Sequence, residues 1–175
     1  MSALDVACGM AASCATVQTL LGIDTEEGTP AERKAAALAL CVADDAGAFD
    51  WLDDGTAAIG MAYDGSALTL EPPLLIVEDA GTEGEPLAGP QLQVFRGALR
   101  IVVVATPAAA DIASTPATRW ARSQQLAILD ELQAQAGSTT AFSRFSVAAP
   151  RPYTSELRDG PFADCWHLPL DLSWE

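Results

Sequence analysis

The segment from Leu92 to Gly137 constrains the fold most, because it joins a strand to one long helix. Seven alternating positions form the strand: Leu99, Ile101, Val103 and Ala105 on one face, and Arg100, Val102 and Val104 on the other. Both sets are largely apolar, so both faces of the strand are expected to meet apolar surroundings. The pattern predicts an inner strand of a sheet.

The helix follows a short connection. Thr115 is suited to the N-cap, Pro116 to the first helical position, and Gly137 to the C-terminal stop. The helix would span about five to six turns. Its apolar side consists of Ala117, Ala121, Ile128, Leu132 and Ala136, with Trp120 and Leu129 beside them. This stripe predicts a helix that covers one face of a sheet.

Two helices are expected before this segment. A capping-box pattern at Ser2 and Asp5 begins the first, which Gly22 ends. Its apolar residues recur at spacings of three and four: Ala3, Ala7, Met10, Cys14, Val17 and Leu21. This periodicity predicts one amphipathic helix that packs in the core.

The second helix has a stronger start signal. Thr29, Pro30 and Glu32 supply an N-cap, an N1 proline and an N3 carboxylate. The run from Ala35 to Ala43 is expected to continue it, with Leu38, Cys41 and Val42 on one side.

An inserted β-hairpin is expected around Asp64-Gly65, because alternating apolar residues lead into and out of this dipeptide. They are Ile59, Met61 and Tyr63 before it, and Leu68 and Leu70 after it. The pattern predicts a tight Asp-Gly turn.

Residues 74–77 form another short apolar run after Pro72-Pro73. The next segment, Glu78 to Gln91, is rich in Gly, Pro and acid and has no apolar period. It is therefore predicted to be an exposed loop that carries a contact. Its candidate contact residues are Glu78, Asp79, Glu83 and Glu85.

The clearest alternation closes the chain. One face consists of Trp166, Leu168, Leu170, Leu172 and Trp174, and the other of His167, Pro169, Asp171 and Ser173. Pro169 lacks an N–H group, so the pattern predicts an edge or near-edge strand with one rim free or in contact with another chain. Together these elements predict one domain over residues 1–175. Its expected class is α+β, with a mixed, mainly antiparallel sheet under one long helix.

The charge is uneven. Residues 1–95 hold 16 of the 24 acidic residues but two of the nine basic ones, so nearly all of the formal charge of −15 lies there. A polyanion of this kind repels nucleic acid and anionic membranes, which argues against a DNA- or RNA-gripping function.

No motif of catalysis or cofactor binding stands out. His167 is the one histidine and has no sequence partner typical of a catalytic or metal site. The cysteines Cys8, Cys14, Cys41 and Cys165 form no C-x-x-C pair, which disfavours zinc and indicates buried thiols in a reducing compartment. The glycine-rich residues 81–89 lack the lysine of a phosphate loop. An enzyme, a cofactor and a metal are therefore not expected.

An acidic cluster precedes the hairpin: Asp44, Asp45, Asp50, Asp53 and Asp54. Its spacing does not fit a calcium loop, so a solvated acidic face is expected. The first basic residue is Arg33, which predicts no secretion signal, and no apolar run is long enough to predict a membrane span. Synthesis in a cytoplasm is the resulting expectation.

The order of elements resembles that of the tail terminator family of tailed bacteriophages. The resemblance covers the first helix and residues 70–175, and rests on residues 70–77, 99–104, 119–135 and 166–174. It implies a structural virion protein, a homohexameric ring at the tail-neck junction that caps the tail tube and joins it to the head-side connector or stopper protein. DNA would pass an acidic lumen without specific binding, and the acidic 78–91 segment could face that lumen.

Ring formation requires two different surfaces on each subunit, because head-to-tail contacts are heterologous. Arg151, Arg158 and Trp174 are candidates for one of them. Three alternatives stay open: another head-tail adaptor or stopper protein, an acidic DNA-mimic binding protein, and a small enzyme.

Overall fold

The computed structural model describes residues 3–44, 50–51, 58–61, 67–70, 73–86, 93–105, 113, 117–136, 138, 144–152 and 166–174. The elements below are built from these residues. The predicted acidic cluster from Asp44 to Asp54 is described only in part. The predicted helix-end residues Ser2, Thr115, Pro116 and Gly137 lie outside the described residues.

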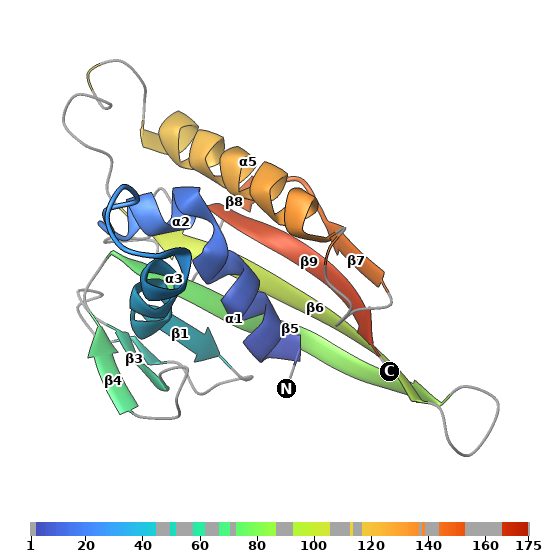
Figure 1. Cartoon of the computed structure of the whole chain (residues 1–175). Helices are drawn as coiled ribbons and strands as arrows, with labels where there is room; N and C mark the ends of the chain where they lie inside the picture. Colours follow the sequence, from blue (N-terminus) through green and yellow to red (C-terminus); the bar gives the residue numbers. More distant parts are fainter. Residues whose placement is uncertain are drawn as a thin grey trace.

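The main sheet contains strands from both halves of the chain (Figure 1). In spatial order they are β1 (Cys41–Asp44), β5 (Leu74–Pro86), β6 (Gln93–Val104), β9 (Trp166–Trp174) and β7 (Arg144–Val147), and β8 (Arg151–Pro152) also pairs with β9. The β1–β5 pair is parallel, whereas the other pairs are antiparallel. The prediction of a mixed, mainly antiparallel sheet is confirmed.

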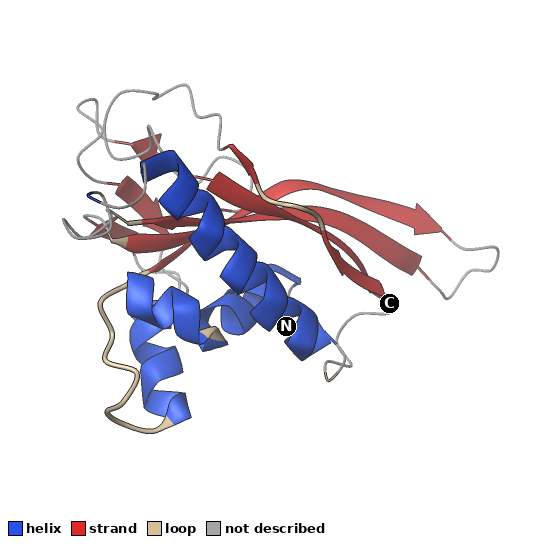
Figure 2. Cartoon of the chain, turned by 90° about the horizontal axis from the view of Figure 1, so that it is seen from above, coloured by secondary structure: helices blue, strands red, loops and turns tan. Residues whose placement is uncertain are grey.

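The helices of the described part of the chain lie on one face of this sheet, as Figure 2 shows. They are α1 (Ala3–Ser13), α2 (Ala15–Leu20), α3 (Pro30–Ala39) and α5 (Ala117–Ala136). Ile128 and Leu132 of α5 are fully buried in the same cluster as Leu75 and Ile101 of the sheet. The α+β class and the long covering helix are therefore confirmed.

The central strands are buried on both faces, as predicted for residues 99–105. The helix-facing side chains Leu99, Ile101 and Val103 belong to the core cluster, whereas the alternate residues Val102 and Val104 are buried outside it. The inner position of β6, between β5 and β9, explains this pattern.

The N-terminal stripe forms two helices, not the single helix that its periodicity predicts. Cys14 adopts an extended conformation, with φ −70° and ψ 128°, and separates α1 from α2. The stripe residues Ala7, Met10, Val17 and Leu21 are nevertheless buried. The hydrophobic pattern thus continues across the break, because both helices pack on the same core.

The second helix begins as predicted and ends earlier. Thr29 and Glu32 form the full capping box. The helix stops at Ala39, because Leu75 N–H donates to the Leu40 carbonyl at 3.0 Å and opens the parallel β1–β5 ladder. Cys41 and Val42 are consecutive strand residues, so the prediction that they share a helix side is wrong.

A second, small sheet consists of β2 (Asp50–Trp51), β3 (Ala58–Met61) and β4 (Ala67–Leu70). The antiparallel β3–β4 pair confirms the inserted hairpin. A two-residue Asp64-Gly65 turn would pair Met61 with Leu68, whereas Met61 pairs with Ala67. The ladder is thus one residue out of register with a tight turn, although the turn itself lies outside the described residues.

Candidate interaction surfaces

The segment predicted as an acidic loop is mostly a strand. β5 runs to Pro86, and its ladder with β6 extends from Leu74–Val104 to Pro86–Gln93. The candidate contact residues Glu78, Asp79, Glu83 and Glu85 all lie within β5. The loop prediction is wrong, because pairing with β6 supplies the order that the missing apolar period did not indicate.

An ion pair joins the neighbouring strands β5 and β6. Glu78 and Arg100 are direct partners in the β5–β6 ladder, and Glu78 Oε2 lies 3.7 Å from Arg100 Nη1. The Arg100 side chain is 43% exposed and that of Glu78 13% exposed. An ion pair of this exposure contributes modestly to stability, so its main effect is to support the register.

The outer edge of β5 is free over much of its length in the described part of the chain. β1 pairs with β5 only from Leu75 to Glu78. Residues 79–86 continue along β6 with no second described strand beside them. At about 3.3 Å per residue this edge is about 26 Å long. It contains Asp79, Glu83 and Glu85 and no basic residue.

The opposite edge of the main sheet is formed by β7 and β8. Both pair with β9, and no other described strand covers them. Residues 144–152 contain Arg144 and Arg151 and no acid. Arg151, a predicted interface residue, is exposed, as is Ser146 of β7. The main sheet therefore ends in an acidic edge on one side and a basic edge on the other.

β9 is a near-edge strand, as its Pro169 predicted. β7 pairs with β9 from Leu170 to Ser173, and β8 pairs with it at Trp166 and His167. Pro169 lies between these two ladders, at the interruption of this rim. The missing N–H group is thus tolerated where cross-strand pairing stops.

The other predicted interface residues are placed only in part. Trp174 pairs with Phe95 near the far end of the β6–β9 ladder. On the other rim of β9 the β7 ladder ends at Ser173, so no described strand pairs with Trp174 there, although β7 and β8 cover most of the rest of that rim. Arg158 lies outside the described residues. His167 pairs with Val102 and Arg151 in the two ladders beside β9.

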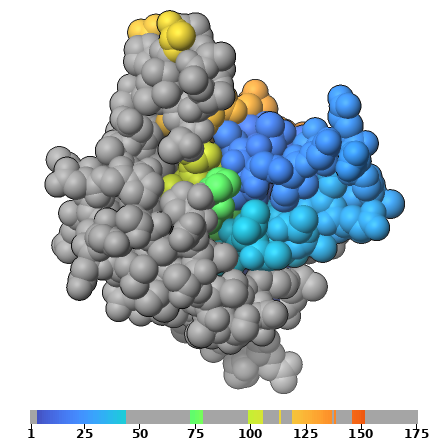
Figure 3. Space-filling view, turned by 90° about the vertical axis from the view of Figure 1, so that its left-hand side faces the viewer, coloured from blue at the N-terminus to red at the C-terminus, as the bar shows by residue number. Residues whose placement is uncertain are grey.

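The helical layer is tied together by Glu131 of α5, a contact that sequence reasoning missed. Its Oε2 accepts from Ala15 N–H at 2.5 Å, and its Oε1 accepts from Thr16 N–H at 3.0 Å and from the Thr16 hydroxyl. Cys14, the N-cap residue of α2, makes no side-chain cap of its own. A carboxylate from a distant helix therefore caps α2. Figure 3 shows the surface of the N-terminal residues, in blue, as one continuous area.

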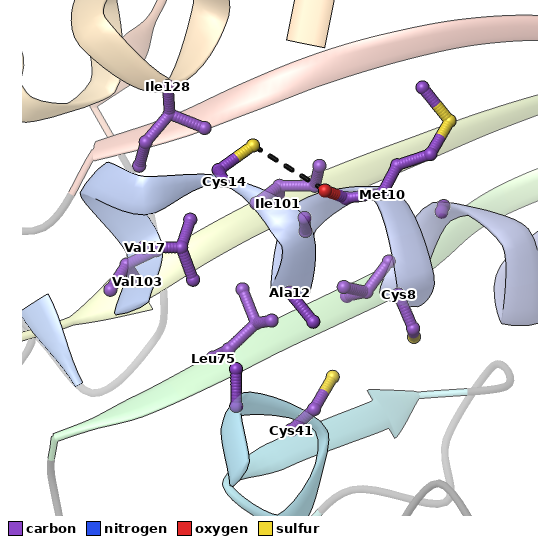
Figure 4. Close-up of a cluster of buried hydrophobic side chains, with 14 of the residues drawn as sticks. Cys8, Met10, Ala12, Cys14, Val17, Cys41, Leu75, Ile101, Val103 and Ile128 are labelled. Atoms are coloured by element: carbon purple, nitrogen blue, oxygen red, sulfur yellow. Dashed lines mark hydrogen bonds between the residues drawn. The ribbon is translucent and has the colours of Figure 1, made fainter. Parts of the chain in front are cut away.

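The thiols Cys8, Cys14 and Cys41 are buried and free, as predicted, whereas Cys165 lies outside the described residues (Figure 4). Burial, aided by the charge of Glu131, raises the pKa of Cys14 to about 12. A hydrogen bond with Cys8 and burial raise the pKa of Cys41 well above its usual value. Because nucleophilic and metal-ligating cysteines act as thiolates, these protonated thiols are suited to packing.

The described residues offer no other centre of chemistry. No group of three or more His, Cys, Asp or Glu among them is arranged to hold a metal ion. Nor does any described helix have the length and hydrophobicity of a membrane span. The candidate cation cluster from Asp44 to Asp54 falls largely on residues outside the description. Among the described residues, the two edges of the main sheet are therefore the surfaces best suited to binding a partner.

The chain matches no protein-family profile, and no curated protein matches it in sequence.

Proposed function

We propose that this protein is a structural virion protein, a tail terminator of a tailed bacteriophage. In this proposal copies of the chain form a homohexameric ring that caps the tail tube and meets the head-side connector or stopper protein. The ring size and the neighbours follow from the resemblance in element order. The protein would act by assembly, without cofactor or metal.

The observation that carries the proposal is the pair of unlike edges on the main sheet. The acidic edge, where β5 extends past β1, and the basic edge on β7 and β8 lie on opposite sides of the main sheet. A closed ring is built from heterologous contacts, in which one surface of a subunit meets a different surface of the next. A subunit with two complementary, non-identical edges suits that symmetry.

The charge supports a role as a conduit. A polyanionic wall repels DNA phosphates, so DNA can pass without being held. The formal charge of −15 on each subunit would give about 90 negative charges to a ring of six. An acidic DNA mimic would share this charge, but would act as a monomer or dimer bound to a nucleic-acid enzyme.

Electron microscopy tests the proposal. Negatively stained purified protein should show rings with a central hole, and phage particles that carry an epitope-tagged copy should bind gold-labelled antibody at the tail-neck junction. Particles in which a different tail protein carries the tag are the control for label position. Particles that contain none of the protein would refute the virion role.

Salt dependence is a second test. Because ionic strength of 0.1 M screens exposed charges beyond about 10 Å, added salt should weaken the repulsion between subunits and favour rings. Sedimentation velocity across a salt series should therefore show larger species at high salt. Large species at low salt that dissociate as salt rises would mean that attraction between the acidic and basic edges outweighs the repulsion of the net charge, and would contradict this expectation.

A further inference from the structure

We propose that residues 79–86 of β5 pair with the edge strand β7 of a second copy of this chain, so that the main sheet continues from one subunit into the next. This inference rests on the proposed ring and specifies its subunit contact. It concerns the two edges described above, which lie on opposite sides of the sheet in Figure 1.

The β5 edge beyond β1 is long and has no second partner strand in the described part of the chain. β5 continues past Glu78, its last residue paired with β1, to Pro86. Alternate residues along this edge direct their backbone N–H and C=O groups away from β6, and such edges are ready templates for strand addition. β7 provides a short strand, Arg144–Val147, which fits within the length of residues 79–86.

The directions of the two edge strands suit this pairing. β5 is antiparallel to β6, β6 to β9, and β9 to β7. β7 therefore runs opposite to β5. A second copy related by rotation about an axis along the strands would bring its β7 antiparallel to β5, which continues the alternation of the sheet.

Charge favours one of the three pairings that two different edges allow, which are β5 with β5, β7 with β7, and β5 with β7. Two β5 edges would bring Asp79, Glu83 and Glu85 against the same residues of the partner, and two β7 edges would bring Arg144 against Arg144. Like charges directly opposite one another destabilise a strand pair. Pairing of β5 with β7 brings acid against base, so the heterologous contact is favoured over either isologous one.

Disulfide trapping tests the contact. Glu83 pairs with Arg96 in β6, and Ser146 pairs with Asp171, which pairs with Ala98. Arg96 and Ala98 are two residues apart, so Glu83 and Ser146 belong to the same face of the sheet by register. Thr82 pairs with Gly97 and belongs to the other face, which makes it a matched control.

The experiment mixes separately purified Glu83→Cys and Ser146→Cys proteins under mild oxidation and identifies linked peptides by mass spectrometry. We propose the antiparallel register that places Arg144 opposite Glu85, which also places Ser146 opposite Glu83. In this register a disulfide between the two different variants is expected, at a yield at least about fivefold above that of Thr82→Cys mixed with Ser146→Cys, because residues directly opposite in a strand pair meet the Cβ distance that a disulfide needs. Equal yields from the two mixtures, or no 83–146 link, would overturn the inference. A predominant 83–83 link would show an isologous contact and would also overturn it.

Charge reversal provides an independent readout. Glu85 is opposite the uncharged Val94, so Glu85→Arg places no like charge directly opposite itself in the subunit ladder. Glu85→Arg and Arg144→Glu should each weaken self-association about two- to fivefold at 0.15 M salt, the range typical of exposed ion pairs. The double variant, which restores acid against base, should recover most of the loss. A double variant as weak as the sum of the single changes would contradict the acid-base contact.

The two proposals fail in different ways. Labelled rings at the tail-neck junction without an 83–146 link would keep the tail terminator role and refute this contact. An 83–146 link in a protein that is absent from phage particles would keep the contact and refute the virion role. Circular dichroism of each variant, matched to the unmodified chain, verifies that the fold is retained.

Discussion

Glu131→Ala should destabilise the fold more than any other exchange of a single described carboxylate. Glu131 lies on α5, yet its two oxygens receive the backbone N–H groups of Ala15 and Thr16 at the start of α2. Those N–H groups have no partner within α2, and Cys14 offers no side-chain cap. The exchange therefore leaves a helix start without its acceptor and removes a contact between two helices.

The magnitude follows from the contacts. A hydrogen bond to a charged group contributes about 1.5–3 kcal/mol, and a carboxylate at a helix N-terminus adds about 0.3–1 kcal/mol. Water can partly replace the lost contacts, because Ala15 is exposed and Thr16 half-buried. We expect a loss of about 2–3 kcal/mol in the free energy of unfolding, which lowers Tm by about 5–10 °C for a chain of this length. Glu131→Gln keeps one acceptor oxygen and should lose about half as much.

The assay is urea unfolding followed by circular dichroism, with thermal melting as a check. Asp130→Ala is the matched control, because it removes the same charge from the neighbouring, exposed position of α5 and should change stability by less than about 0.5 kcal/mol. If Glu131→Ala is no less stable than Asp130→Ala, the carboxylate does not cap α2 and the reasoning is wrong.

Three further predictions concern titration and the single histidine. Hydrogen bonds from Thr29 lower the pKa of Glu32, so this stabilisation is full above the unfolded-state pKa of about 4.3 and is lost as pH falls through the lowered folded-state pKa. Glu32→Gln should flatten the acid limb of a Tm-against-pH curve. Burial raises the pKa of Cys14 to about 12, so stability should fall as pH rises above about 8.5, the pKa of an unfolded thiol, and Cys14→Ala should reduce that loss in urea titrations. His167→Ala should cost no more than about 1 kcal/mol by thermal melting and leave assembly intact, whereas a folded variant that fails to assemble would refute this.

Local patterns predicted the parts of the fold that local physics determines. The alternation of residues 99–105 indicated a strand buried on both sides, and β6 has that position. The Thr29 and Glu32 pattern indicated a capping box, and both of its hydrogen bonds are present. In the capping box the two partners lie three residues apart, and in β6 the apolar pattern itself indicates burial on both faces.

Two predictions about the N-terminal helices are wrong because the residues that stabilise the observed structure lie far away in the sequence. The break at Cys14 is stabilised by Glu131, more than 100 residues later, so the periodic stripe gave no sign of it. Similarly, Cys41 and Val42 leave the helix because β5 offers them a parallel ladder. Residue spacing alone could not predict either contact, since neither changes the apolar period.

The strand at residues 79–86 differs from these cases, because its partner in β6, residues 93–99, is close in the sequence, and the strand's own residues have no apolar period. Gly81, Gly84 and Pro86 favour a loop, and a loop replaced by a shorter Gly-Ser link would change stability by only about 0.6 kcal/mol per halving of its length. Residues 82–86 instead pair with residues 93–97 of β6. Cross-strand pairs contribute about 0.2–1 kcal/mol each, so replacement of residues 82–88 by a Gly-Ser link, which removes these five pairs, should cost about 1–5 kcal/mol and lower Tm by several degrees. An unchanged Tm would mean that this end of the hairpin adds nothing to stability. The same replacement should abolish the 79–86 edge, so assembly should fall further than the change in stability explains.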